Sequence, residues 1–131
     1  MKTKLSALFA LTLVAALSAF GLRAEDKAAE KPPEIKGEKI SVKGEIIDMW
    51  CYMEGGDKGA EHKKCAQACA KSGNPVGILD EKGNVYTLMG GQKDHQPAHT
   101  ILVDKMADMV TIEGTMVEKG GTKVIFVTVI K

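Results

Sequence analysis

A chain of 131 residues with 18 basic and 17 acidic side chains is nearly neutral and has the length of one small domain. With a net charge of only +1, one tryptophan, two tyrosines and three phenylalanines, the composition argues against binding of nucleic acid or of an anionic membrane surface. Its three cysteines are an odd number, so at least one thiol has no disulfide partner within the chain.

Residues 1–24 have the features of a secretory signal peptide. A start with two lysines precedes the apolar run from Leu5 to Leu22, and Ala24 is a small residue suited to cleavage. No second apolar span follows, so we expect the cleaved chain to be exported, periplasmic or secreted, without membrane attachment. Retention of the apolar run as an uncleaved anchor is the alternative.

Residues 25–36 are charged and contain two prolines, which predicts a disordered linker. Residues 37–131 then form the single small domain. Ile40, Val42 and Ile46 alternate with polar residues, and this period of two predicts a half-buried strand that continues to about residue 50. A glycine in its middle would let the strand bend.

The next segment contains all three cysteines in the spacing C-x10-H-x2-C-x3-C, formed by Cys51, His62, Cys65 and Cys69. The residues from His62 to Cys69 favour a helix, which Gly73 would end. On such a helix His62, Cys65 and Cys69 lie on one face within an arc of roughly 60°. Cys51 follows the strand directly, and a glycine-rich loop would bring it opposite that face.

The remaining elements follow in a regular order. A five-residue turn separates the second strand from the third, and it lacks the spaced carboxylates of a calcium loop. The predicted short helix would face the core through Leu102 and Met106. The predicted segments are a strand 76–79, a turn 80–84, a strand 85–89, a helix 98–107, a strand 109–118 and a strand 123–130.

This order predicts a mainly β fold, a five-stranded barrel of the oligonucleotide/oligosaccharide-binding (OB) type. Gly44 and Gly114 lie in the middle of two long strands, where a closed barrel needs bending points. The Cys/His helix is inserted after the first strand, and the second short helix falls between the third and fourth strands, as is typical of OB barrels. An open β-meander packed on one helix is the alternative.

Two interpretations of the cysteines stay open, and we favour a metal site. Thiolates of Cys51, Cys65 and Cys69 with the imidazole of His62 make a Cys3His set, which suits zinc, and copper(I) also accepts such thiolates. With all four positions filled by protein, the site would be structural or for storage rather than hydrolytic.

The alternative is one disulfide with a spare thiol. Residues four apart on a helix have Cβ atoms about 5–6 Å apart, whereas a disulfide needs roughly 3.5–4.5 Å, so Cys65 and Cys69 are a poor pair. A bridge from Cys51 to either of them would staple the helix to the barrel, and His62 would be an ordinary surface residue. The barrel would then bind a protein or glycan partner through its loops. A redox-reactive thiol is a third possibility, weakened by the lack of a C-x-x-C motif.

Little else in the sequence indicates chemistry, and no catalytic motif appears, so we expect no enzymatic activity. His95 and His99 are four apart with a proline between them, which favours a solvated loop pair over a second metal-ligand pair.

The methionine and tryptophan side chains near the cysteines could either contribute to the metal site or pack in the core. Met49, Met53 and Met89 are possible soft ligands for copper, but apolar packing is the commoner use of methionine. Trp50 and Tyr52 flank Cys51 and would wall the site, although core packing is the expectation that we favour for Trp50.

The chain resembles a functionally uncharacterised family of small exported bacterial proteins in three stretches of its sequence. These are GEIIDMWCY, HKKCAQACAKSGNPVGIL and VEKGGTKVIFV. The shared pattern is a strand ending in cysteine, an H-x2-C-A-x2-C helix, a G-x-P-x-G run matched by Gly73, Pro75 and Gly77, and a final glycine-turn hairpin. The resemblance extends from about Val42 to Ile130. It implies a shared Cys/His site on a small β-barrel and supplies no reaction.

Overall fold

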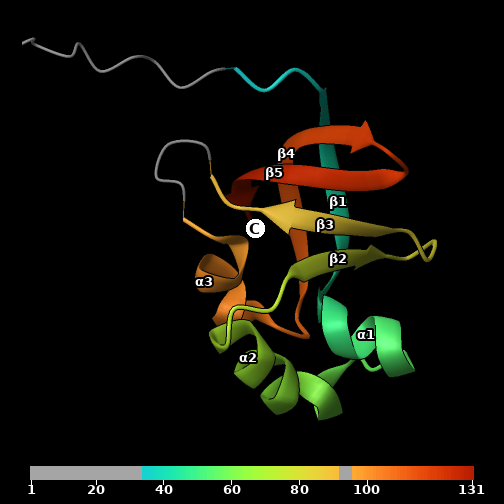
Figure 1. The fold of residues 1–131 in the computed structure, drawn as a ribbon, viewed down its shortest axis with the longest axis vertical. Helices are drawn as coiled ribbons and strands as arrows, with labels where there is room; N and C mark the ends of the chain where they lie inside the picture. The colour runs from blue at the N-terminus through green and yellow to red at the C-terminus, as the bar shows by residue number, and fades with distance from the viewer. Residues whose placement is uncertain (1–33, 92–95) are drawn as a thin grey trace, which may run out of the picture. The chain divides into compact units, whose positions relative to one another are not determined.

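The structure is a computed structural model that describes residues 34–91 and 96–131. The described part forms a barrel of five strands with three short α-helices and two 3-10 turns (Figure 1). The predicted signal peptide and most of the predicted linker fall outside it. The elements are β1 (Glu38–Asp48), α1 (Met49–Gly55), η1 (Ala60–His62), α2 (Lys63–Lys71), β2 (Val76–Asp80), β3 (Val85–Met89), α3 (Ala98–Leu102), η2 (Val103–Lys105), β4 (Met109–Lys119) and β5 (Thr122–Ile130).

The strands close into a barrel in the order β1-β2-β3-β5-β4, and β4 returns to pair with β1. All neighbours are antiparallel except β3 and β5, which run parallel. Helix α3 lies between β3 and β4 in the chain, as predicted. The OB-like barrel is therefore confirmed, and the open meander is not what forms.

The glycines in the middle of β1 and β4 mark the points where the barrel bends. Gly44 pairs with both neighbouring strands, and a Cβ atom there would approach the carbonyl oxygen of Leu79 to 2.3 Å. At Gly114 a Cβ atom would meet the carbonyl oxygen of Phe126 at 2.3 Å, beside an irregularity in the β4–β5 register. The absence of a side chain at both positions lets the strands approach closely enough to close the barrel.

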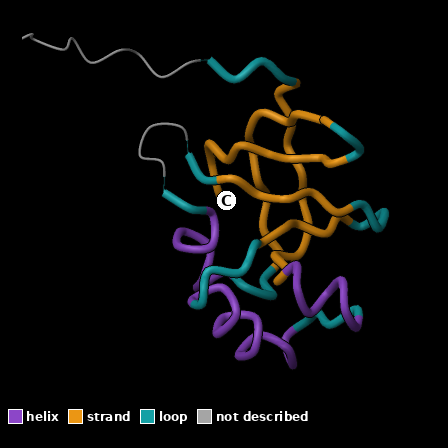
Figure 2. Tube along the Cα trace, in the orientation of Figure 1, coloured by secondary structure: helices purple, strands orange, loops and turns teal. Residues whose placement is uncertain are grey.

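The core lies inside the barrel and extends beneath the helices. Leu102 and Met106 are fully buried, as predicted, and they close one end of the barrel. Helix α2 adds Ala66 and Ala70 to the same core. Figure 2 shows the helices gathered at this end, while the strands form the rest of the domain. None of the helices in the described residues is both long and apolar enough to cross a membrane.

Several predictions, most of them near the first cysteine, were wrong. The first strand ends at Asp48 rather than near residue 50, and Cys51 lies in the separate helix α1 rather than at the end of a strand. Trp50, which we expected in the core, is 65% exposed because α1 turns it outward. Met53 on α1 and Met89 at the end of β3, for which apolar packing was expected, are exposed as well.

Replacing Gly44 by alanine tests the bending point in β1. The added methyl group would press on the backbone of Leu79, which cannot move without disturbing the β1–β2 pairing. We expect Gly44→Ala to lower the free energy of unfolding by about 1–3 kcal/mol in urea denaturation. Gly91→Ala is the matched control because its nearest contact would be an ordinary 3.7 Å. Equal stability of the two variants would contradict this account of the bend.

Candidate metal centre

A buried aspartate at the junction of β1 and α1 positions the first cysteine. Asp48 is 1% exposed, and its carboxylate accepts hydrogen bonds from the backbone N–H groups of Trp50 at 3.3 Å and Cys51 at 3.1 Å. This is an N-cap, which satisfies N–H groups that a helix start leaves without partners. The backbone N–H of Met49 also donates to the carbonyl of Pro75 at 3.1 Å. Cys51 is thus held in the first turn of α1.

Helix α2 supplies the other two cysteines and is anchored at both ends. Near its start the ammonium group of Lys63 contacts the carboxylate of Asp108 at 2.6 Å, just before β4. At its end Gly73 adopts φ of 92°, the left-handed conformation that ends a helix, as predicted. The loop that leads into α2 is tied to β1, since the backbone N–H of Gly59 donates to the carboxylate of Glu45.

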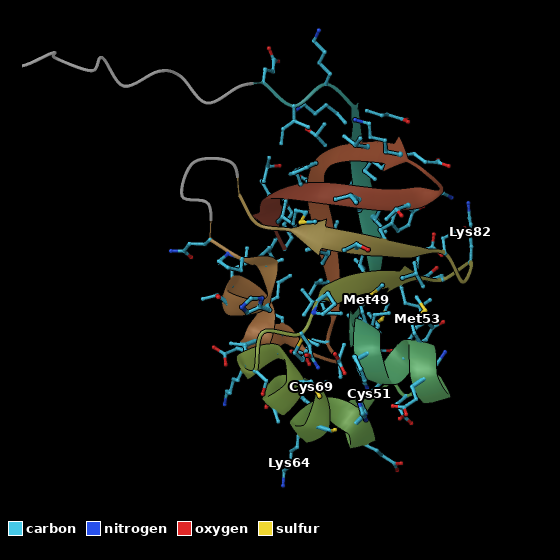
Figure 3. The ribbon with its side chains drawn as sticks, in the orientation of Figure 1. Met49, Cys51, Met53, Lys64, Cys69 and Lys82 are labelled. Atoms are coloured by element: carbon cyan, nitrogen blue, oxygen red, sulfur yellow. The ribbon has the colours of Figure 1, made fainter. Side chains whose placement is uncertain are left out.

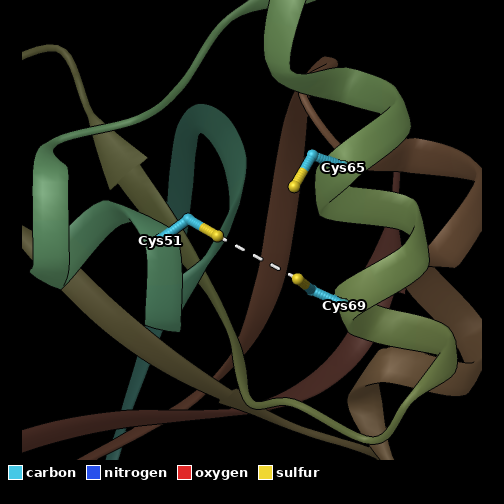
Figure 4. A group of neighbouring side chains, drawn as sticks. All are labelled: Cys51, Cys65 and Cys69. Atoms are coloured by element: carbon cyan, nitrogen blue, oxygen red, sulfur yellow. Dashed lines mark hydrogen bonds between the residues drawn. The ribbon is translucent and has the colours of Figure 1, made fainter.

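The three cysteine sulfurs meet between α1 and α2. Figure 4 shows Cys51 projecting from α1 toward Cys65 and Cys69 on α2. The Sγ atoms of Cys51 and Cys69 are 4.0 Å apart, and all three sulfurs lie within 4.8 Å of one another. At a metal–sulfur bond of about 2.3 Å, sulfurs are about 3.8 Å apart around a tetrahedral ion and about 4.0 Å apart around a trigonal one. The observed separation of 4.0 Å therefore suits a shared ion.

His62 approaches Cys51 from a second side. Ligand atoms of His62, Asp48 and Cys51 also lie within 4.8 Å of one another, so Cys51 belongs to two groups of possible ligands. His62 does not fall within the group that contains Cys65 and Cys69. Its Nε2 atom is buried and has no hydrogen-bond partner. A buried nitrogen without a partner is costly for a protein, and a metal ion is one way to satisfy it.

Asp48 is the one member of the site that was not predicted from the sequence. An aspartate directly before a helix is a typical N-cap, but the expected continuation of the strand hid that signal. Both carboxylate oxygens already accept backbone hydrogen bonds, so this side chain acts first as a cap.

The same carboxylate also affects the thiols electrostatically. A hydrogen bond to Asp48, partial burial and the neighbouring Cys69 together raise the pKa of Cys51 strongly above its usual range. Burial and the charge of Asp48 raise the pKa of Cys69 as well. Near neutral pH both groups are therefore protonated thiols rather than reactive thiolates, and an ion that binds them has to release their protons.

No disulfide forms in the described residues, and all three cysteines are free. Cys51 and Cys69 would have to bring their sulfurs closer by about 2 Å to reach the length of an S–S bond. The disulfide that the sequence analysis left open as an alternative is therefore absent. Cys51 does face Cys69 on the inserted helix, but from helix α1 rather than from the end of a strand.

Comparison with family models, curated proteins and solved structures finds no match to this chain. The resemblance to small exported bacterial proteins thus stays a prediction. Of the second histidine pair, His95 lies outside the described residues, and His99 is half-buried in α3.

Alkylation rates test the electrostatics of the cluster. In reduced, metal-free protein we expect iodoacetamide to modify exposed Cys65 first at neutral pH. Modification of Cys51 and Cys69 should be slower because a raised pKa leaves less thiolate, and its rate should keep rising with pH into the alkaline range. Peptide mapping by mass spectrometry measures the order.

The matched variant is Asp48→Asn, which keeps a good N-cap but removes the negative charge. It should speed alkylation of Cys51 relative to the parent protein, while circular dichroism stays unchanged. Modification of Cys51 before Cys65 in the folded parent protein would contradict this account.

Proposed function

We propose that this chain is a small exported metal-binding protein that holds zinc or copper(I) between α1 and α2. The ligands are the thiolates of Cys51, Cys65 and Cys69, with the imidazole of His62 as the fourth. The observation that carries the proposal is the meeting of three sulfurs, from two separately anchored helices, within 4.8 Å of one another. Scattered cysteines without a common role have no reason to converge in this way.

The unpartnered Nε2 of His62 supports its assignment as fourth ligand. Asp48 is the other group beside Cys51, but capping of α1 already occupies its carboxylate. Completing the shell requires the imidazole, which lies beside Cys51, to approach Cys65 and Cys69 as well. Zinc would then have the tetrahedral Cys3His shell of a closed, structural or storage site.

Copper(I) suits the same cluster in a different geometry. It accepts soft thiolates in low coordination numbers, so the three sulfurs alone provide a sufficient set without the histidine. The two metals thus differ in what they require of His62, which gives a way to tell them apart.

Metal content and single substitutions test the proposal. Native mass spectrometry of the exported chain should find about one zinc or copper ion per molecule. Cys51→Ser should remove most of the bound metal because this residue belongs to both groups of ligands.

His62→Ala distinguishes the two metals. It should weaken zinc binding by about tenfold or more, and copper(I) binding much less, in a competition titration with a chelator. The control is His99→Ala, which changes a half-buried histidine on α3 and should leave binding unchanged.

A disulfide-stapled barrel that binds a protein or glycan partner is the second candidate. The 4.0 Å separation of the Cys51 and Cys69 sulfurs favours it, since a modest movement in an oxidising compartment would allow the bridge. Metal-free exported protein with one free thiol, and a peptide that links Cys51 to Cys69, would replace the metal proposal with this one.

A further inference from the structure

The outer face of α1 carries large apolar side chains that are normally buried. Trp50 is 65% exposed and Met53 is 61% exposed. Together with Met49, Glu54 and Pro75 they line a hollow of about 450 Å³. Figure 3 labels Met49 and Met53, which lie on the same helix α1 as Cys51. The two thioethers and the indole therefore share one open surface next to the cysteine cluster.

Helix geometry explains how the residues divide between two faces. Met49 and Met53 are four residues apart, so their side chains are neighbours, and Trp50 lies within about 100° of them around the helix axis. Cys51 points away from this face, toward α2 (Figure 4). One short helix thus presents a thiol on one side and two thioethers with an indole on the other.

The first of these thioethers is held in place by its packing. A Cβ atom at Gly77 would come within 2.5 Å of the Met49 sulfur, so the missing side chain of Gly77 makes the space that this sulfur occupies. The half-buried Met49 and the exposed Met53 then differ in freedom. The Met49 sulfur packs against the barrel at Gly77, and the Met53 side chain extends into solvent.

We propose that this face is a copper(I) site, in which the sulfurs of Met49 and Met53 bind the ion and the indole of Trp50 lies against it. Thioethers are neutral, soft ligands that select copper(I) and bind zinc poorly. Tryptophan is the best aromatic partner for a cation, and the carboxylate of Glu54 adds an attractive negative charge at the rim. The inference rests on the proposed function for its choice of a soft metal, and it names copper(I) as that metal.

The sequence provides a built-in reporter, since Trp50 is the only tryptophan of the chain. The experiment uses the chain with Cys51→Ser, Cys65→Ser and Cys69→Ser, so that only the methionine site remains. Copper(I) added without oxygen should quench most of the tryptophan fluorescence at about one equivalent, and zinc should not. Adding Met53→Leu should weaken this binding by about tenfold or more. Met89→Leu, at an exposed methionine on β3, should leave it unchanged.

A second measurement on the parent chain covers the case in which the cysteine-free variant does not fold. There the methyl NMR signals of Met49 and Met53 should shift on addition of copper(I) beyond the first equivalent, while that of exposed Met109 should not. Quenching that persists unchanged in Met53→Leu, or unshifted methyl signals in the parent chain, would overturn the site. Loss of metal from the cysteine cluster alone would leave the cysteine-free titration intact, so the failures of the two proposals are distinguishable.

Discussion

The buried carboxylate of Asp48 is the contact on which the candidate site depends. It ends β1 and starts α1 by accepting two backbone N–H groups, and this sharp change of direction takes Cys51 out of the barrel wall. If the strand continued, the following side chains would alternate between core and solvent, and Cys51 would not face α2. The cap, rather than the cysteines themselves, decides where the first sulfur lies.

The barrel in turn holds Asp48 in place. The carboxyl end of β1 pairs with β2 up to Val76, and the start of α1 is bonded to the backbone at Pro75. Gly44 makes this possible, because the strand can leave β4 and continue along β2 only if it approaches Leu79 closely. The bend at Gly44 thus helps to determine where the Cys51 sulfur lies, because only the end of β1 and the cap at Asp48 separate the two.

Most of the fold could be predicted because its signals are local. Alternating residues predicted β1 and β4, and mid-strand glycines predicted the bends. Helical spacing placed Cys65 and Cys69 correctly on one face of α2, whereas His62, predicted on the same helix, lies in η1 and outside their group. Helix α1 could not be found in this way. It has seven residues, Trp and Tyr have modest helix propensity, and its start depends on one cap that also fits a strand end. Because helix α1 was not predicted, Trp50 was wrongly expected in the core, and Asp48 was not recognised as part of the site.

The two roles of Asp48 act against each other. Its negative charge stabilises the N-terminus of α1, where N–H groups point at it. Its hydrogen bond to the Cys51 thiol, and to a smaller extent its charge, raise the pKa of Cys51 and so oppose the thiolate that a metal needs. A cation placed among the sulfurs would remove this opposition, because it attracts both the thiolate and the carboxylate beside it and so lowers the pKa of the thiol. The arrangement favours protonated thiols without an ion and thiolates with one. Protonated thiols react with oxidants more slowly than thiolates, so this arrangement lowers the reactivity of Cys51 and Cys69 in the absence of an ion.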